Sequence, residues 1–294
     1  MKRIFSLFAV ALIWAVLFSC SSLPDSSQTG SSVYKITKDG NTLYLGGSIH
    51  ILRDGDYPLP RQFDRAFSQS SVLVLETDIQ QIADENVVAY LASQMTLPAG
   101  QTLRSVLDPD TYSRLEAAFY DYGYLLQGES NLKPSLVINV LTSLQVQKYG
   151  FVEEGVDAHY LQRAMNEKKA VAFLESIESQ IDLIVTMGDG YENEFVLYSL
   201  QDMASTETDL AELVYEWKNG ISSILVESLI EMREDWPDIY KAMVTDRNAA
   251  WMPQIERFLS SGTVHFVIVG LAHLHGPDGL LRQLEDLGCT VENL

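Results

Sequence analysis

The chain has 294 residues, 47% of them hydrophobic, and carries 40 acidic against 20 basic side chains, a formal net charge of −20. The apolar content excludes an intrinsically disordered chain and is enough for a substantial core. The negative charge argues against nucleic acid or an anionic membrane surface as a partner, because their phosphates would be repelled.

The first twenty residues predict a bacterial lipoprotein signal peptide. Lys2 and Arg3 precede an apolar run over residues 4–18, which leads to Ser19 and Cys20. A basic start followed by a short apolar run is typical of a signal peptide rather than of a membrane span. Cys20 is then the residue expected to be lipidated. An ordinary secretory peptide with an incidental cysteine is the open alternative.

Lipidation would tie the protein to the bacterial cell envelope through its lipid alone. Ser21, directly after the cysteine, favours the outer membrane, with the domain in the periplasm or at the surface. Residues 21–32 are rich in serine and are expected to form a flexible tether. Residues 33–294 are expected to form a single domain.

The N-terminal half of that domain predicts a β-hairpin followed by a third strand and a series of helices. Short apolar runs rich in β-branched residues predict buried strands, and apolar residues at helical spacing predict helices. We expect strands at 33–38, 42–47 and 71–76, and helices at 62–69, 86–94, 110–120, 134–148 and 156–167.

The C-terminal half continues the alternation of strands and helices. We expect strands at 170–175, 264–270 and 290–291, a mostly helical stretch at 179–244 broken near 188–190 and 219–220, and helices at 247–259 and from 276–279 to 287. This order predicts an α/β fold with a central, mostly parallel sheet and covering helices. Residues 84–168 and 179–245 are expected to form a large helical insertion or cap.

Two of the predicted strands end in the same short motif. Gly47 is followed three residues later by His50, and Gly270 is followed three residues later by His273. A glycine at the end of a strand lets the backbone approach another group closely. Open α/β sheets bind their ligands beyond the carboxyl ends of the strands. The motif therefore predicts that both histidines lie in a site.

Two further strands end in carboxylates, Glu76 and Glu175. Two imidazoles and two carboxylates at one sheet edge suit a hydrolytic centre in two ways. They bind a divalent metal that activates water, for which this mixed ligand set favours Mn, Co, Zn or Fe. Alternatively, histidine and glutamate act as acid and base without a metal. Each glutamate taken alone also fits a helix cap.

Arg247 and Asn248 begin a predicted helix, where the arginine either pairs with a carboxylate of the site or forms a surface ion pair of little energetic value. His275 follows His273 by two residues and is expected to support the site or lie on the surface.

An ordered set of segments resembles the TraB/GumN family, which includes the animal Tiki peptidases. The resemblance covers about residues 32–294, and its segments are Leu-Gly-Gly-Ser-Ile-His at 45–50, Leu-Val-Leu-Glu-Thr-Asp at 73–78, Leu-Lys-Pro at 132–134, Gly-Val-Asp at 155–157, Phe-Leu-Glu-Ser-Ile-Glu-Ser-Gln at 173–180, Asp-Arg-Asn at 246–248 and Val-Gly-Leu-Ala-His-Leu-His-Gly at 269–276.

The resemblance implies an α/β fold and an active centre built from the two Gly-x-x-His motifs and a glutamate. It implies metal-dependent peptidase activity, with Mn or Co as the ion. Carried over to this chain, it marks as catalytic His50, Glu76, Arg247 and His273, of which His50, Glu76 and His273 are the expected metal ligands. The expected supporting residues are Gly47, Gly270, Glu175, Gln180, Asn248 and His275.

The leading functional hypothesis is therefore a lipid-anchored envelope hydrolase, a metal-dependent peptidase acting on peptides or other small molecules. One alternative is a protein that binds and sequesters peptides without cleaving them, as relatives named for shutting down a pheromone response suggest. Another is a lipoprotein that captures haem or metal ions. The chain is expected to be a monomer or a homodimer.

Overall fold

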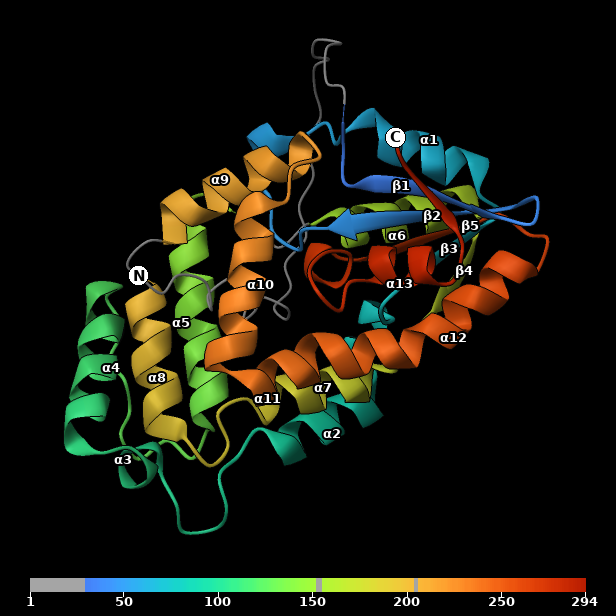
Figure 1. Cartoon of the computed structure of the whole chain (residues 1–294). Coiled ribbons are helices and arrows are strands. Elements are labelled where there is room, and N and C mark those ends of the chain that lie inside the picture. Colours follow the sequence, from blue (N-terminus) through green and yellow to red (C-terminus); the bar gives the residue numbers. More distant parts are fainter. Residues whose placement is uncertain (1–29, 152–154, 204–205) are drawn as a thin grey trace. The chain divides into compact units, whose positions relative to one another are not determined.

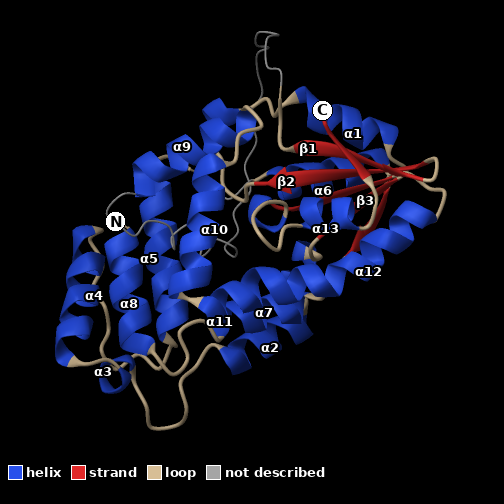
Figure 2. Ribbon diagram, viewed as in Figure 1, coloured by secondary structure: helices blue, strands red, loops and turns tan. Residues whose placement is uncertain are grey.

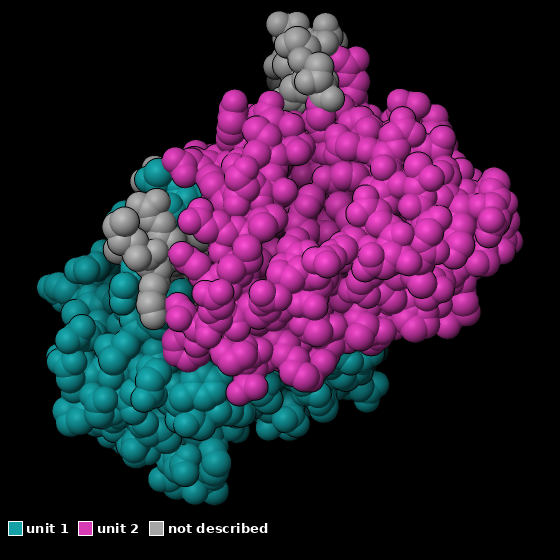
Figure 3. Space-filling view, viewed as in Figure 1, with its two compact units in different colours: residues 1–13, 78–150, 176–209 teal, residues 14–77, 151–175, 210–294 magenta. Residues whose placement is uncertain are grey.

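The computed structural model describes residues 30–151, 155–203 and 206–294. The predicted signal peptide, the expected lipidation site Cys20 and most of the predicted tether lie outside the described residues. The chain divides into two compact units (Figure 3): unit 1 contains residues 78–150 and 176–209, and unit 2 contains the described residues up to 77, 151–175 and 210–294. No helix in the described ranges is long and apolar enough to cross a membrane.

The described part of unit 2 is built on a six-stranded sheet with the order β4-β3-β5-β2-β1-β6 (Figures 1 and 2). Its first four strands in this order run parallel, whereas β1 is antiparallel to both β2 and β6. The strands are β1 (Val33–Lys38), β2 (Asn41–Ser48), β3 (Val72–Leu75), β4 (Ala170–Phe173), β5 (His265–Gly270) and β6 (Thr290–Asn293). This sheet and its helices confirm the predicted α/β fold.

The central strands are apolar because both faces of the sheet are covered. In β5 every residue from His265 to Val269 is buried, and in β2 every residue from Leu43 to Ser48 is buried. Parallel strands with two covered faces have such continuous apolar runs rather than an alternating pattern. The predicted hairpin is also present, and its turn residues Asp39 and Gly40 have φ angles of 50° and 81°.

The helices of unit 2 pack around this sheet. They are η1 (Asp54–Asp56), α1 (Arg61–Gln69), α6 (Val156–Glu167), α10 (Ser223–Asp235), α11 (Pro237–Tyr240), the π-helix η3 (Lys241–Thr245), α12 (Asp246–Ser260), η4 (Leu271–His273) and α13 (Leu280–Asp286). An aromatic core joins α1 and α6 to the sheet: the ring of Phe63 in α1 lies 6.0 Å from that of Tyr160 in α6 and 6.2 Å from that of Phe266 in β5.

Unit 1 is helical in its described part. Its elements are η2 (Ile79–Ala83), α2 (Glu85–Gln94), α3 (Leu103–Val106), α4 (Pro109–Asp121), α5 (Pro134–Lys148), α7 (Ile177–Val185), α8 (Glu192–Asp202) and the start of α9 (Thr206–Lys218), which continues into unit 2. Val87 of α2 packs with Ile177, Ile181 and Val185 of α7 in a buried cluster. Asp108 caps α4 by accepting from the backbone N–H of Thr111.

The mostly helical stretch predicted over residues 179–244 is a series of helices, interrupted where the breaks were predicted. The chain breaks at the predicted glycines, where Gly188, Gly190 and Gly220 have φ angles of 84°, 89° and 66°. Glycine reaches such angles without the steric cost that other residues meet. The predicted helix 156–167 is α6, and it groups with the sheet in unit 2.

Candidate active site at the carboxyl edge of the sheet

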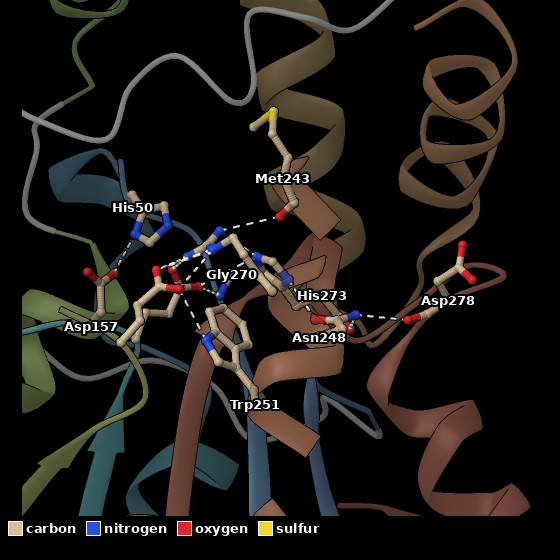
Figure 4. Close-up of polar contacts among 11 residues, drawn as sticks. His50, Asp157, Met243, Asn248, Trp251, Gly270, His273 and Asp278 are labelled. Atoms are coloured by element: carbon tan, nitrogen blue, oxygen red, sulfur yellow. Dashed lines mark hydrogen bonds and ion pairs between the residues drawn. The ribbon is translucent and has the colours of Figure 1, made fainter. Parts of the chain in front are cut away.

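The parallel strands deliver charged and polar side chains to one edge of the sheet (Figure 4). Ser48 of β2 pairs with Gly270 of β5, so the two Gly-x-x-His motifs leave the sheet side by side. Glu76 directly follows β3, and Glu175 follows β4 by two residues. The four strand-end residues predicted from the sequence, together with Arg247 of α12, therefore lie in one unit and at one edge.

Arg247 is the centre of this cluster, and all its N–H groups are engaged. Its Nη2 donates to Glu76 Oε2 at 2.5 Å and to Glu175 Oε1 at 2.7 Å. Its Nη1 donates to His273 Nε2 at 2.8 Å and to the carbonyl oxygen of Met243 at 3.4 Å, and its Nε donates to Glu175. A guanidinium has five N–H donors. None is left for a substrate, so Arg247 positions the side chains around it.

The surroundings of Arg247 hold its guanidinium in place. The group lies 4.6 Å from the ring centre of Trp251, a cation–π contact, and the arginine side chain is only 15% exposed. The π-helix η3 directly precedes α12, and such segments are frequent at functional sites. The sequence left two possibilities for Arg247, pairing with a carboxylate of the site or a surface ion pair. The structure shows pairing with carboxylates of the site.

The two glutamates share Arg247 as a partner but differ in their second partner. Glu175 has both oxygens engaged, since Oε2 accepts from the indole N–H of Trp251 at 3.2 Å while Oε1 accepts from Arg247. Glu76 accepts from Arg247 through Oε2 and from the backbone N–H of Gly270 through Oε1, at 2.6 Å. Burial, the largest single effect, would raise the pKa of Glu76, but the charge of Arg247, the nearby histidines and the N–H of Gly270 together outweigh it and lower that pKa to about 2. Glu76 is therefore ionised at neutral pH.

Asn248 determines which nitrogen of His273 carries the proton. The Asn248 amide nitrogen donates to the carbonyl oxygens of His273 and Asp278, at 3.1 and 2.8 Å. Its oxygen must then accept, so His273 Nδ1, 2.8 Å away, is the donor. Burial, reinforced by the charge of Arg247, lowers the pKa of His273 to about 3. The imidazole is neutral, and its Nε2 lone pair points at Arg247.

His50 is the most exposed member of the cluster, with 38% of its side chain accessible. Its Nδ1 lies 3.0 Å from Asp157 Oδ1, at the start of α6. Burial would lower the pKa of His50, but the adjacent Asp157 carboxylate raises it to about 9. With Nδ1 held by Asp157, His50 presents Nε2 to the site.

The glycines of the two motifs have different surroundings. A β-carbon added to Gly270 would lie 3.3 Å from Glu76 Oε1 and 3.6 Å from His50 Nε2. One added to Gly47 would instead lie 2.4 Å from Leu271 Cδ1, in the packed interior. Gly270 thus lies next to two reactive groups that an added methyl group would touch, whereas Gly47 allows close packing.

Comparison with known proteins identifies the family. The model of the TraB/PrgY/gumN family matches residues 32–293. The chain belongs to this family. Among similar proteins, metalloprotease TIKI1 of Danio rerio is 26% identical over 196 residues, which are 57% of this chain and 38% of that protein. Metalloprotease TIKI1 of Homo sapiens is 33% identical over 100 residues, 33% of this chain and 19% of that protein. The matched residues of this chain thus span well under half the length of these relatives.

The expected metal ligands of this family member do not fit a metal site as they are arranged. His273 has a single lone pair, on Nε2, and it accepts from Arg247, as does Glu76 Oε2. Arginine stays protonated in proteins, so these donor atoms already contact a positive charge. Within the described ranges, no group of three His, Cys, Asp or Glu side chains is placed to hold an ion.

Two predicted supporting residues remain to be placed, and two contributors were not predicted. Gln180 lies on α7, in unit 1. His275 contacts Tyr34 of β1, with 3.5 Å between Nε2 and the phenol oxygen. Asp157 and Trp251 were not predicted as site residues. Asp157 does belong to the Gly-Val-Asp segment that carried the family resemblance, which was the available signal.

Proposed function

We propose that this chain is a lipid-anchored hydrolase of the bacterial cell envelope that cleaves peptide bonds, with His50 and Glu76 as the groups that face the substrate. Its support comes from the family, from relatives named metalloproteases, and from the cluster of ionised and imidazole groups at the carboxyl edge of the sheet. The proposed reaction does not assume a metal ion, and a requirement for Mn, Co, Zn or Fe is tested by adding the ions.

The single observation that carries the proposal is the space beside Gly270. Glu76 Oε1 and His50 Nε2 border that space, while Arg247, Glu175 and His273 have their polar atoms engaged with one another. A reacting group that approaches Gly270 would meet one carboxylate and one imidazole nitrogen. These are the groups that general acid–base hydrolysis requires.

In the proposed reaction the residues of the chain have separate tasks. Glu76 Oε1 accepts a hydrogen bond from the attacking water and so orients it. As the water oxygen bonds to the carbonyl carbon, the Glu76 carboxylate takes the water's proton. His50, protonated at neutral pH because its pKa is about 9, donates its Nε2 proton to the leaving amine as the C–N bond breaks, while Asp157 keeps its ring in place. Arg247 holds Glu76 ionised and fixes its direction, which is a positioning role rather than direct contact with the substrate.

Replacing the two substrate-facing groups is expected to abolish turnover while leaving the fold intact. His50→Ala and Glu76→Gln should each lower kcat/KM on a cleaved peptide by about 10²–10⁴-fold, because each removes a proton-transfer or water-orienting group. The measurement is cleavage of a peptide library by protein starting after Cys20, with and without added Mn²⁺, Co²⁺ or Zn²⁺, read by mass spectrometry. His159→Gln is the control, because this histidine lies on α6 with its ring against Tyr57.

Full activity in either site variant would contradict the assignment. Tight peptide binding without cleavage in wild-type protein would instead favour the sequestering alternative. A Soret absorption band in the purified protein would favour haem capture.

The space beside Gly270 also predicts a steric effect. Gly270→Ala should lower kcat/KM by about 10²-fold, because the methyl group occupies the space between His50 and Glu76. Its backbone angles, φ −50° and ψ 136°, suit alanine, so the free energy of unfolding should change by less than about 1 kcal/mol. Gly47→Ala provides the contrast, since packing against Leu271 should cost about 1–3 kcal/mol of stability. Unaltered activity in Gly270→Ala would exclude the proposed substrate position.

The envelope location is part of the proposal and depends on Cys20. Cys20→Ser should move the protein from the membrane fraction to the soluble fraction of lysed cells, because the lipid is the proposed anchor. An immunoblot of the two fractions measures this. Continued membrane association of Cys20→Ser would contradict the lipid anchor.

A further inference from the structure

Three atoms of the kind that bind transition metals surround the guanidinium of Arg247. They are Glu76 Oε2, Glu175 Oε1 and His273 Nε2, at 2.5, 2.7 and 2.8 Å from its nitrogens. Two carboxylate oxygens and an imidazole nitrogen form a ligand set suited to Mn, Fe, Co or Zn. In this structure all three atoms point at an arginine instead.

We propose that Arg247 is the built-in cation of this site, and that it competes with a divalent metal ion for the same three donor atoms. The inference concerns ion binding and holds whether or not the chain cleaves peptides. It accounts for a chain whose relatives are named metalloproteases but whose own candidate donor atoms are already paired with an arginine.

Charge and geometry both make the two cations mutually exclusive. The guanidinium cannot lose its proton to make room, and its side chain is held by Trp251 and by the backbone of η3. A divalent ion bound to Glu76 and His273 would lie next to this fixed positive charge at a site where the side chains are 15% exposed or less. Repulsion between close charges is strong where water is scarce.

The donors are nevertheless pre-arranged for an ion once the guanidinium is gone. Asn248 holds His273 in the tautomer whose lone pair is on Nε2, as supporting residues do for metal-binding histidines. Two carboxylates and one neutral imidazole would also balance the charge of a divalent ion. Removal of the arginine is therefore expected to convert the cluster into a metal site.

The test is metal binding by four proteins: wild type, Arg247→Met, Arg247→Met/His273→Ala and Arg163→Met. Arg163 is the matched control, because it also pairs with two carboxylates, Asp64 at 2.6 Å and Glu167 at 2.7 Å, but no histidine completes its set. Each protein is stripped with a chelator, equilibrated with Mn²⁺, Co²⁺ or Zn²⁺, and measured by elemental analysis and titration calorimetry. Thermal melting with and without the ion provides a second readout.

Arg247→Met should bind one equivalent at least about tenfold more tightly than wild type, and its melting temperature should rise with the ion. The double variant and Arg163→Met should behave as wild type. Stoichiometric metal in wild type that is lost in His273→Ala or Glu76→Gln would overturn the proposal, and so would the absence of any gain in folded Arg247→Met. Should Arg247→Met fail to fold, the wild-type measurement decides: no metal supports the proposal, and metal lost in Glu76→Gln overturns it.

Discussion

Arg247→Met is expected to lower the free energy of unfolding by about 3–5 kcal/mol, because it leaves Glu76 and Glu175 buried without a counter-charge. Removing one partner of a buried ion pair costs more than the pair itself contributes, since the remaining charge has neither water nor a partner. Urea unfolding in metal-free buffer, followed by circular dichroism, measures the change.

Arg163→Met is the control here too, since its ion pairs lie at the surface, where such pairs contribute about 0–1 kcal/mol.

The pH dependence of stability adds a second check. In wild type the pKa of Glu76 lies at about 2, below its ordinary value of 4.5, so its stabilising contribution is complete above 4.5 and is lost as the pH falls towards 2. In Arg247→Met the loss of stability between pH 4.5 and 2 should be absent, because the Glu76 pKa is no longer lowered by the arginine. Equal stability of the two arginine variants at neutral pH would refute the central role of Arg247.

Gly155→Ala is expected to separate His50 from Asp157. A β-carbon at Gly155 would lie 2.3 Å from the carbonyl oxygen of Ile49 and 2.4 Å from His50 Cα, and backbone atoms cannot yield as a flexible side chain can. We expect a loss of about 3 kcal/mol in the free energy of unfolding, because α6 must move away from the strand end. Activity should fall as in His50→Ala, because the histidine loses its orienting carboxylate.

Gly55→Ala is the matched control, since no atom lies within 4 Å of its added β-carbon and its backbone has no positive φ. It should change stability by less than about 0.5 kcal/mol. Denaturant unfolding and peptide cleavage, measured on both variants, give the comparison. A Gly155→Ala protein with wild-type stability and activity would show that the close approach is not needed.

The strands and their terminal residues were predictable because the signals are local. An apolar, β-branched run that ends in glycine or a charged residue predicts a buried strand, and parallel strands bring such ends to one edge. His50, Glu76, Glu175 and His273 follow from this rule alone. The break points at Gly188 and Gly220 are local signals of the same kind.

Asp157 could not be predicted in this way, because its contact with His50 joins residues 107 positions apart in the chain. The contact depends on a glycine that lets α6 approach the backbone of His50, a requirement visible only when both segments are in place. His275 shows the opposite case. Its position beside a site histidine predicted either a supporting role or a surface position, and the structure places its ring against Tyr34 of β1.

The amino-acid sequence by itself determined the alternation of strands and helices and the chemical groups at the strand ends, because these depend on neighbours within a few residues. Only the tertiary structure decided how those groups are paired. It placed Arg247 where its five N–H groups donate hydrogen bonds to Glu76, Glu175, His273 and the carbonyl oxygen of Met243. It left His50 as the more exposed imidazole of the cluster. Pairing depends on the distance between atoms contributed by different elements, and that distance is set when the helices pack on the sheet.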